Sequence, residues 1–182
     1  MYGTARSLPI WRIQAILKFA VLASILGASS TMAQQTSEKE AVEATVTGND
    51  QQVGFRAMVM KQAIEYNLAG SAQNDANEIV RFTLQGNKKR IDSALATIQE
   101  GTKRSSDIKI TTTPAAIDPT LNAFTIVDWT SSSRNITNKY NLVFEVRAED
   151  TAISPEGAKA AWRLILEKTL DADDLKKLQP SD

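Results

Sequence analysis

The residues best suited to chemistry form a polar, glycine-containing stretch that leads into a helical pattern. They are Gly48-Asn49-Asp50-Gln51-Gln52-Val53-Gly54-Phe55-Arg56. We expect a strand that ends at Gly48, a short loop, and a helix that begins around residues 54–56. The N–H groups of the loop and of the helix N-terminus would then converge on one point and attract an anion. Arg56 adds a permanently charged fork of donors that suits a phosphate or a carboxylate. The stretch predicts a phosphate cradle, and a purely structural turn is the alternative interpretation.

The chain contains no His and no Cys. This composition excludes Ser-His-Asp and Cys-His nucleophile pairs, imidazole or thiolate metal ligands, and a His general base. Any hydrolysis must therefore rely on Arg, Lys, Asn, carboxylates, hydroxyls and backbone amides. One acidic cluster could in principle hold Mg²⁺ or Ca²⁺, but its pattern is that of a helix start. It is Asp171-Ala172-Asp173-Asp174. We predict no metal and no cofactor.

Residues 1–33 have the pattern of a signal peptide. Basic residues precede an apolar run at positions 19–28, and small residues lead to Ala33. The apolar run is short for a membrane span, and an uncleaved N-terminal anchor is the alternative. Cleavage after Ala33 would start the mature chain at Gln34. We therefore expect an exported protein, periplasmic or secreted, without a membrane attachment after cleavage.

Charge gives little reason to expect a nucleic-acid partner. The leader holds Arg6, Arg12 and Lys18 and no acidic residue, so the remaining chain is slightly negative. The expected strands also lack the paired exposed aromatic and basic residues with which sheets bind nucleic acids. Nucleic-acid binding is therefore the weakest of three functional hypotheses.

Alternating and helical hydrophobic patterns indicate the elements around the polar stretch. Residues 34–41 are expected to be a flexible leader. Strands are expected at 42–47, 68–74, 78–84, 107–112 and 124–129, and helices at 56–66 and 88–100. The order strand, helix, strand, strand, helix, strand predicts an α+β fold. It is a ferredoxin-like βαββαβ sandwich with one antiparallel sheet and two helices on one face.

Residues 130–182 are expected to form a C-terminal extension packed on the domain at 42–129. Alternation at 140–147 predicts a strand that extends the sheet, and Ser154-Pro155-Glu156 is a strong helix start. The helix to residue 170 carries Trp162 on an aliphatic stripe, and a short helix should follow to residue 178. The long helix could bind a protein partner or cover the open face of the sheet. We favour cover, because the stripe has the composition of a docking face.

These residues and the order of the expected elements resemble those of acylphosphatases. The first signature of that family, G-x-V-Q-G-V-G-F-R, is in register with residues 48–56. The second, G-W-V-x-N, is in register with Gly70-Ser71-Ala72-Gln73-Asn74. Weaker matches are Gln85-Gly86 and Phe124-Thr125-Ile126. The resemblance covers about residues 42–129.

The resemblance implies a small metal-independent hydrolase that cleaves the carboxyl–phosphate bond of acyl phosphates. It implies that Arg56 and the backbone of Asn49, Asp50, Gln51, Gln52 and Val53 bind the phosphate, and that Asn74 orients the attacking water. This chemistry suits a chain without His and Cys, because a carboxylate is a good leaving group and catalysis can rely on positioning and charge. Asn74 can hold a water through its carboxamide without becoming charged; a plain turn residue is the alternative.

Three of the departures from the family pattern bear on this interpretation. Asp50 replaces a valine, Gln52 replaces a glycine, and Ser71 replaces a tryptophan. The first two alter the loop itself, through charge and through the backbone angles that a glycine permits. They leave a second hypothesis open: a catalytically impaired acylphosphatase-like domain that acts as an anion-binding or protein-interaction module.

Overall fold

The computed structural model of the protein describes residues 38–49, 54–76 and 79–178. Its strands are β1 (Lys39–Asn49), β2 (Ala69–Asn74), β3 (Val80–Asn87), β4 (Ser106–Pro114), β5 (Ala123–Ser131) and β6 (Ile136–Glu145). Its helices are α1 (Phe55–Glu65), α2 (Lys88–Glu100), the 3-10 turn η1 (Ser132–Arg134), α3 (Pro155–Thr169) and α4 (Ala172–Lys176). None of the described helices is long and apolar enough to cross a membrane. The expected signal peptide lies outside the described residues.

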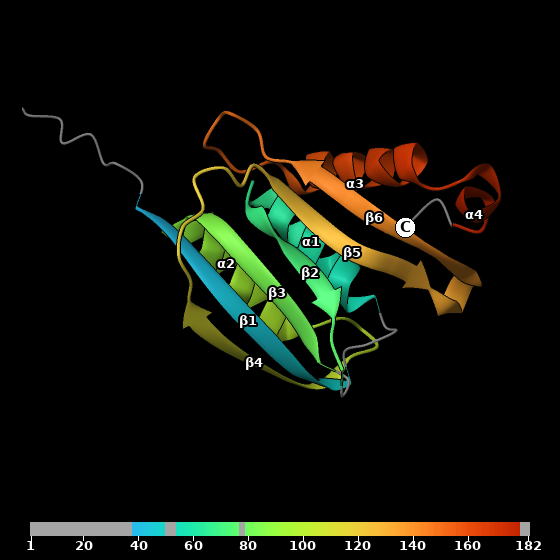
Figure 1. The fold of residues 1–182 in the computed structure, drawn as a ribbon, viewed down its shortest axis with the longest axis horizontal. Coiled ribbons are helices and arrows are strands. Elements are labelled where there is room, and N and C mark those ends of the chain that lie inside the picture. The colour runs from blue at the N-terminus through green and yellow to red at the C-terminus, as the bar shows by residue number, and fades with distance from the viewer. Residues whose placement is uncertain (1–37, 50–53, 77–78, 179–182) are drawn as a thin grey trace, which may run out of the picture. The chain divides into compact units, whose positions relative to one another are not determined.

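The strands form one sheet in the order β4-β1-β3-β2-β5-β6 (Figure 1). Its first four strands, with α1 and α2, make the predicted ferredoxin-like βαββαβ unit. One pair differs from the expected antiparallel sheet, because β5 runs parallel to β2. The chain reaches β5 by passing along the end of the sheet. There Asp118 exchanges two hydrogen bonds with the side chain of Gln85, each 2.7 Å long.

The sheet begins earlier in the sequence than expected. Lys39 to Ala41, which the sequence predicts to be part of the flexible leader, pair with Asn87 to Gln85 of β3. The carbonyl oxygen of Glu38 also accepts a hydrogen bond from Lys88 N–H at 2.9 Å. The expectation was wrong because β3 continues for three residues past its alternating apolar pattern, and its backbone groups need partners.

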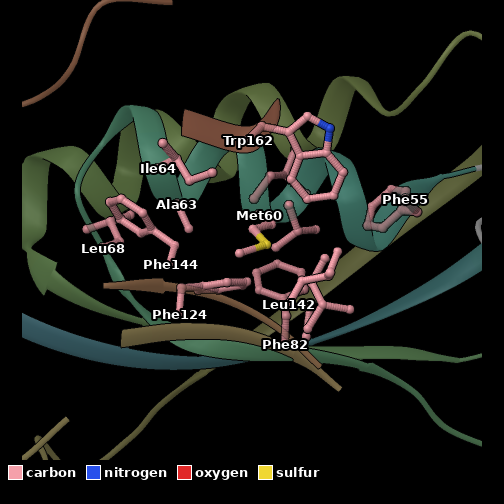
Figure 2. Packing of buried hydrophobic residues seen from close by; sticks show 14 of the residues in the cluster. Phe55, Met60, Ala63, Ile64, Leu68, Phe82, Phe124, Leu142, Phe144 and Trp162 are labelled. Carbon is pink, nitrogen blue, oxygen red and sulfur yellow. The ribbon is translucent and has the colours of Figure 1, made fainter. Parts of the chain in front are cut away.

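The core lies between one face of the sheet and the helices. Strand alternation places Val80, Phe82 and Leu84 of β3 inward, and all three are fully buried. The helices bury Val59, Met60 and Ala63 from α1, and Ile91, Ala94 and Ile98 from α2. Figure 2 shows part of this cluster, in which Trp162 of α3 lies above Met60 and Leu142.

The position of α3 corrects one expectation. It does not cover the open face of the sheet; it packs against α1 and β6, on the face that already carries α1 and α2. β5 and β6 widen the sheet, and their inward residues Ile126, Leu142 and Phe144 need an apolar cover. Trp162 supplies part of that cover, and Lys61 Nζ lies 5.4 Å from the centre of its ring.

The segment after β6 is tied to the end of α1 by Asn67, which is buried and has a φ of 52°. Its Nδ2 donates to the carbonyl oxygens of Arg147 and Glu149 at 3.1 and 2.9 Å, and its Oδ1 accepts from Arg147 N–H at 2.8 Å. Arg147 therefore leaves the sheet, although its alternating position predicted a strand. Asn tolerates the left-handed backbone that this arrangement needs.

A polar cluster fixes α4 against β6. Asp171 caps α4 by accepting from Asp174 N–H at 2.7 Å, as the predicted helix start requires. The buried Asp174 carboxylate accepts from Tyr140 Oη at 2.7 Å and from Lys177 Nζ at 2.6 Å. These contacts, Lys177 first, lower the pKa of Asp174. The acidic cluster of the sequence therefore has a structural role in this helix.

Candidate active site at the N-terminus of α1

Arg56 lies in the first turn of α1, and its guanidinium is held by the backbone of β5. Nη1 donates to the carbonyl oxygens of Val127 at 2.8 Å and Asp128 at 3.2 Å. Nε and Nη2 make no hydrogen bond to any residue in the described ranges. Burial lowers the pKa of Arg56, and the Asp128 carboxylate opposes that shift. An arginine stays protonated throughout the physiological range. The side chain is therefore a positive charge in a fixed position, and its Nε and Nη2 can donate hydrogen bonds to a ligand.

A bulge in β5 turns both carbonyl oxygens toward Arg56. The register between β5 and β6 shifts between Ile126 and Trp129, and Asp128 has a left-handed φ of 51°. Two side chains of β6 hold the bulge: Asn141 Oδ1 accepts from Asp128 N–H at 3.1 Å, and Lys139 Nζ pairs with Asp128 Oδ2 at 3.1 Å. Bulges commonly re-aim groups in this way. The C-terminal extension thus supports the arginine of the N-terminal motif.

Two glycines shape the ends of the motif. Gly54 precedes α1 with a φ of 82°, and a Cβ built there would meet nothing closer than Arg104 Nη2 at 3.9 Å. The backbone angle therefore requires this glycine, whereas close packing requires the glycine at position 48. A Cβ on Gly48 would lie 2.5 Å from Asp107 O. In the described part of the chain, α1 has neither a capping side chain nor an acidic residue in its first turn, so none of these side chains satisfies the N–H groups that could bind an anion there.

Asn74 is the last residue of β2 and is exposed. Its side chain makes no hydrogen bond to another described residue. It lines the same cavity as Arg56, a space of about 490 Å³ beside the N-terminus of α1. The fold therefore brings the two side chains of the two motifs to one cavity, which is of the usual size for a small-molecule site.

The expected phosphate cradle lies largely outside the described residues. Asn49 is the last residue of β1, and α1 starts at Phe55. Asp50, Gln51, Gln52 and Val53 connect these two ends, and their part in binding phosphate stays a prediction.

The cavity also has basic walls that the sequence did not reveal. They are Lys61 of α1, Lys103 and Arg104 of the loop after α2, and Arg134 of η1. Trp129, Trp162 and Leu166 add apolar surface, and no Asp or Glu lines the cavity among the described residues. In the sequence, the adjacent Lys103 and Arg104 shortly after the helix-ending Gly101 are a pattern that indicates a basic loop at this place. Arg134 gave none, because it reaches the cavity only through the pairing of β5 with β2.

Among the described residues, no group of three or more His, Cys, Asp or Glu side chains is placed to hold a metal ion. In the described ranges, the polar side chains that line the cavity are basic groups, hydroxyls and the carboxamides of Gln62 and Asn74. This set suits an anionic ligand better than a cation.

Comparison with known proteins gives consistent relatives. Residues 42–126 match the acylphosphatase family. An acylphosphatase of Chlorobaculum tepidum is 31% identical over 86 residues, which are 47% of this chain and 94% of that protein. An acylphosphatase of Methanocella arvoryzae is 32% identical over 74 residues, 40% of this chain and 84% of that protein. The crystal structure of acylphosphatase from Bacillus subtilis has a TM-score of 0.46 and 25% identity, covering 50% of this chain and 99% of that chain.

Proposed function

Because the chain belongs to the acylphosphatase family, we propose that it is an exported hydrolase that cleaves the carboxyl–phosphate bond of acyl phosphates without a metal ion. The observation that supports this most is the convergence of Arg56 and Asn74 on one cavity at the N-terminus of α1. These are the two residues of the chain that match the functional arginine and asparagine of the family motifs. The substrate is a small acyl phosphate.

The proposed reaction needs only groups that the chain contains. The phosphate binds against the N-terminal N–H groups of α1 and the spare donors of Arg56. The Asn74 carboxamide holds a water, which attacks phosphorus as the bond between phosphorus and the carboxylate oxygen breaks. The carboxylate leaves as an anion, and the proton of the water passes to the released phosphate. No side chain has to change its protonation state, which fits a chain without His and Cys.

Arg56 serves best when it is fixed before the substrate arrives. Its bonds to Val127 O and Asp128 O hold one guanidinium nitrogen and leave the others for phosphate. A charge that is already in place stabilises the developing charge of the transition state without reorganising. The contribution of β5 and β6 to the site is therefore to hold Arg56 in position.

The purified mature protein should hydrolyse benzoyl phosphate in the presence of EDTA. One unit of charge at about 4 Å is worth about 4 kcal/mol at an effective dielectric near 20, so Arg56→Ala should lower kcat/KM by about 10³-fold. Asn74→Ala should lower it by about 10²-fold through loss of water positioning. Arg163→Ala, on the exposed side of α3, is the matched control and should be neutral.

A wild-type rate no higher than that of Arg56→Ala would refute the hydrolase. The non-catalytic anion-binding or protein-interaction module would then be the function to pursue. Export has a separate test: the protein recovered from the periplasm or the medium should begin at Gln34. A retained N-terminus in the membrane fraction would favour the uncleaved anchor.

A further inference from the structure

Sulfur occurs at only two positions of the predicted mature chain. The full chain has no Cys, so its methionines carry all of its sulfur. Met1 and Met32 belong to the predicted signal peptide, which leaves Met58 and Met60 in the mature protein. Thiols and thioethers are the side chains that peroxides oxidise at sulfur. A peroxide that reaches the mature protein therefore has these two thioethers as its sulfur targets.

The fold exposes one of these thioethers and shields the other. Met60 is fully buried in the core between α1 and the sheet, where Figure 2 shows it below Trp162. Met58 is only partly buried, and it lines the cavity that also holds Arg56. The reactivity of a methionine toward a dissolved oxidant follows its access to solvent. Met58 should therefore react while Met60 is protected, although only one residue separates them.

Met58 lies near the start of α1, where the phosphate binds in the proposed function. Its N–H donates to Gly54 O at 3.0 Å, so Met58 lies one helical turn after Gly54. Helical side chains lean toward the N-terminus and over the residue four positions earlier. Gly54 has no side chain to fill that space, and Arg104 Nη2 lies 3.9 Å from the position that a Cβ there would take. The thioether of Met58 therefore leans toward the N-terminal N–H groups of α1 and toward a guanidinium.

We propose that Met58 is a reversible oxidation site through which peroxides weaken anion binding at the N-terminus of α1. Hydrogen peroxide transfers one oxygen atom to the sulfur: the thioether is oxidised to a sulfoxide, and the peroxide is reduced to water. The sulfoxide oxygen is a polar acceptor that competes with phosphate for the helix N–H groups and for Arg104. Methionine sulfoxide reductases reverse the change by reducing the sulfoxide with a dithiol, which becomes a disulfide and releases water. The effect on phosphate rests on the proposed function, whereas the site of modification does not.

Peptide mapping of the peroxide-treated mature protein tests the modification site. Trypsin cleaves after Arg56 and Lys61 and releases residues 57–61, which contain both methionines. The fragment masses should place the added oxygen on Met58 and show Met60 unmodified. In urea, which exposes both side chains, the two should be oxidised together. Oxidation of Met60 as fast as Met58 in the native protein would overturn the proposal.

Calorimetric titration with inorganic phosphate tests the effect on anion binding. Peroxide should raise the Kd of the wild type by about fivefold, which corresponds to one neutral hydrogen bond, and treatment with sulfoxide reductases should restore it. Met58→Leu keeps a similar side-chain volume and cannot form a sulfoxide, so peroxide should leave its Kd unchanged. Met60→Leu is the matched control and should keep the response of the wild type.

Three results would contradict these expectations in different ways. An unchanged Kd in wild-type protein oxidised at Met58 would refute the effect on anion binding. An equal rise of Kd in peroxide-treated Met58→Leu would show that another residue causes it. A reduced wild type that binds no phosphate would refute the anion site of the proposed function and this effect with it, while the mapped position of the oxygen still decides the modification site.

Discussion

Asp128 connects the C-terminal extension to Arg56, and two substitutions separate its backbone role from its charge. Asp128→Val keeps a side chain at a φ of 51° but replaces Asp with a β-branched residue that disfavours this region. Asp128→Asn keeps a residue that tolerates it and removes only the charge. The question is whether the bulge survives the strain.

The hydrogen bonds that hold the bulge together outweigh the expected strain of a valine at position 128. A left-handed backbone costs about 1–2 kcal/mol for an ordinary residue, and somewhat more for valine. Against this, a hydrogen bond from a charged donor contributes about 1.5–3 kcal/mol, and Arg56 Nη1 bonds to two carbonyl oxygens of the bulge. The bond from Asp128 N–H to Asn141 Oδ1 adds about 1 kcal/mol. The strain should therefore appear as lost stability and not as a displaced arginine.

We expect Asp128→Val to lower the free energy of unfolding by about 2 kcal/mol, which lowers Tm by roughly 4–8 °C in a domain of this size. Its kcat/KM for benzoyl phosphate should stay within about fivefold of the wild type, because loss of the carboxylate alone changes substrate affinity by at most about that factor. Urea denaturation and steady-state kinetics on the same preparation measure both quantities. Unchanged stability with a loss of more than about 100-fold in activity would refute the reasoning, because the carbonyl oxygens would then not hold Arg56.

Asp128→Asn should be close to neutral for stability, because the lost pair with Lys139 is exposed and contributes at most about 1 kcal/mol. The Asp128 carboxylate lies near enough to Arg56 to counteract the lowering of its pKa. It should therefore also repel the bound phosphate. KM should fall by about 1.5- to 5-fold at low ionic strength, and the difference should disappear at high salt. A higher KM would show that the carboxylate helps to bind substrate.

Two further predictions concern the contacts of the extension. Asn67→Ala removes three hydrogen bonds to the segment after β6 and places alanine at a φ of 52°. The free energy of unfolding, measured in urea, should therefore fall by about 4 kcal/mol. In Asn67→Gly the loss should be smaller by about 1 kcal/mol, because glycine adopts this backbone conformation without strain. The pKa of Asp174 is lowered on folding, first by Lys177 and then by Tyr140. Its ionised form therefore stabilises the protein above the unfolded pKa of about 3.9, and this contribution is lost as the pH falls through the lower folded value. Asp174→Asn should accordingly be less stable than the wild type at pH 7, and the two denaturation midpoints should converge as the pH falls through the lower folded pKa. A constant difference at all pH values would contradict this role of Asp174.

Local patterns in the sequence were sufficient for the helices, for most strands and for the two motifs. The alternation of Val80, Phe82 and Leu84 with polar residues identifies β3, and the capping residue Ser154 identifies the start of α3. These features depend on neighbours a few residues apart, which a sequence shows directly. The order of these elements then predicted the ferredoxin-like unit, since few topologies accommodate it.

The same patterns could not show which distant elements meet. Nothing near Arg56 in the sequence indicates that its guanidinium bonds to Val127 and Asp128, because a bulge and a parallel strand pair create that contact. The face of the sheet on which α3 packs also depends on how much apolar surface β5 and β6 expose beside α1. Both outcomes are set by the pairing of strands that are far apart in the chain.

The sequence by itself determined the chemistry that is open to this protein: an arginine, an asparagine and backbone donors, in a chain without His or Cys. The tertiary structure decided where that chemistry is placed and what surrounds it. Only the packed sheet brings Arg56, Asn74, Arg104 and Arg134 to one cavity, because each is carried there by a different strand, helix or loop whose position depends on burial of the common core.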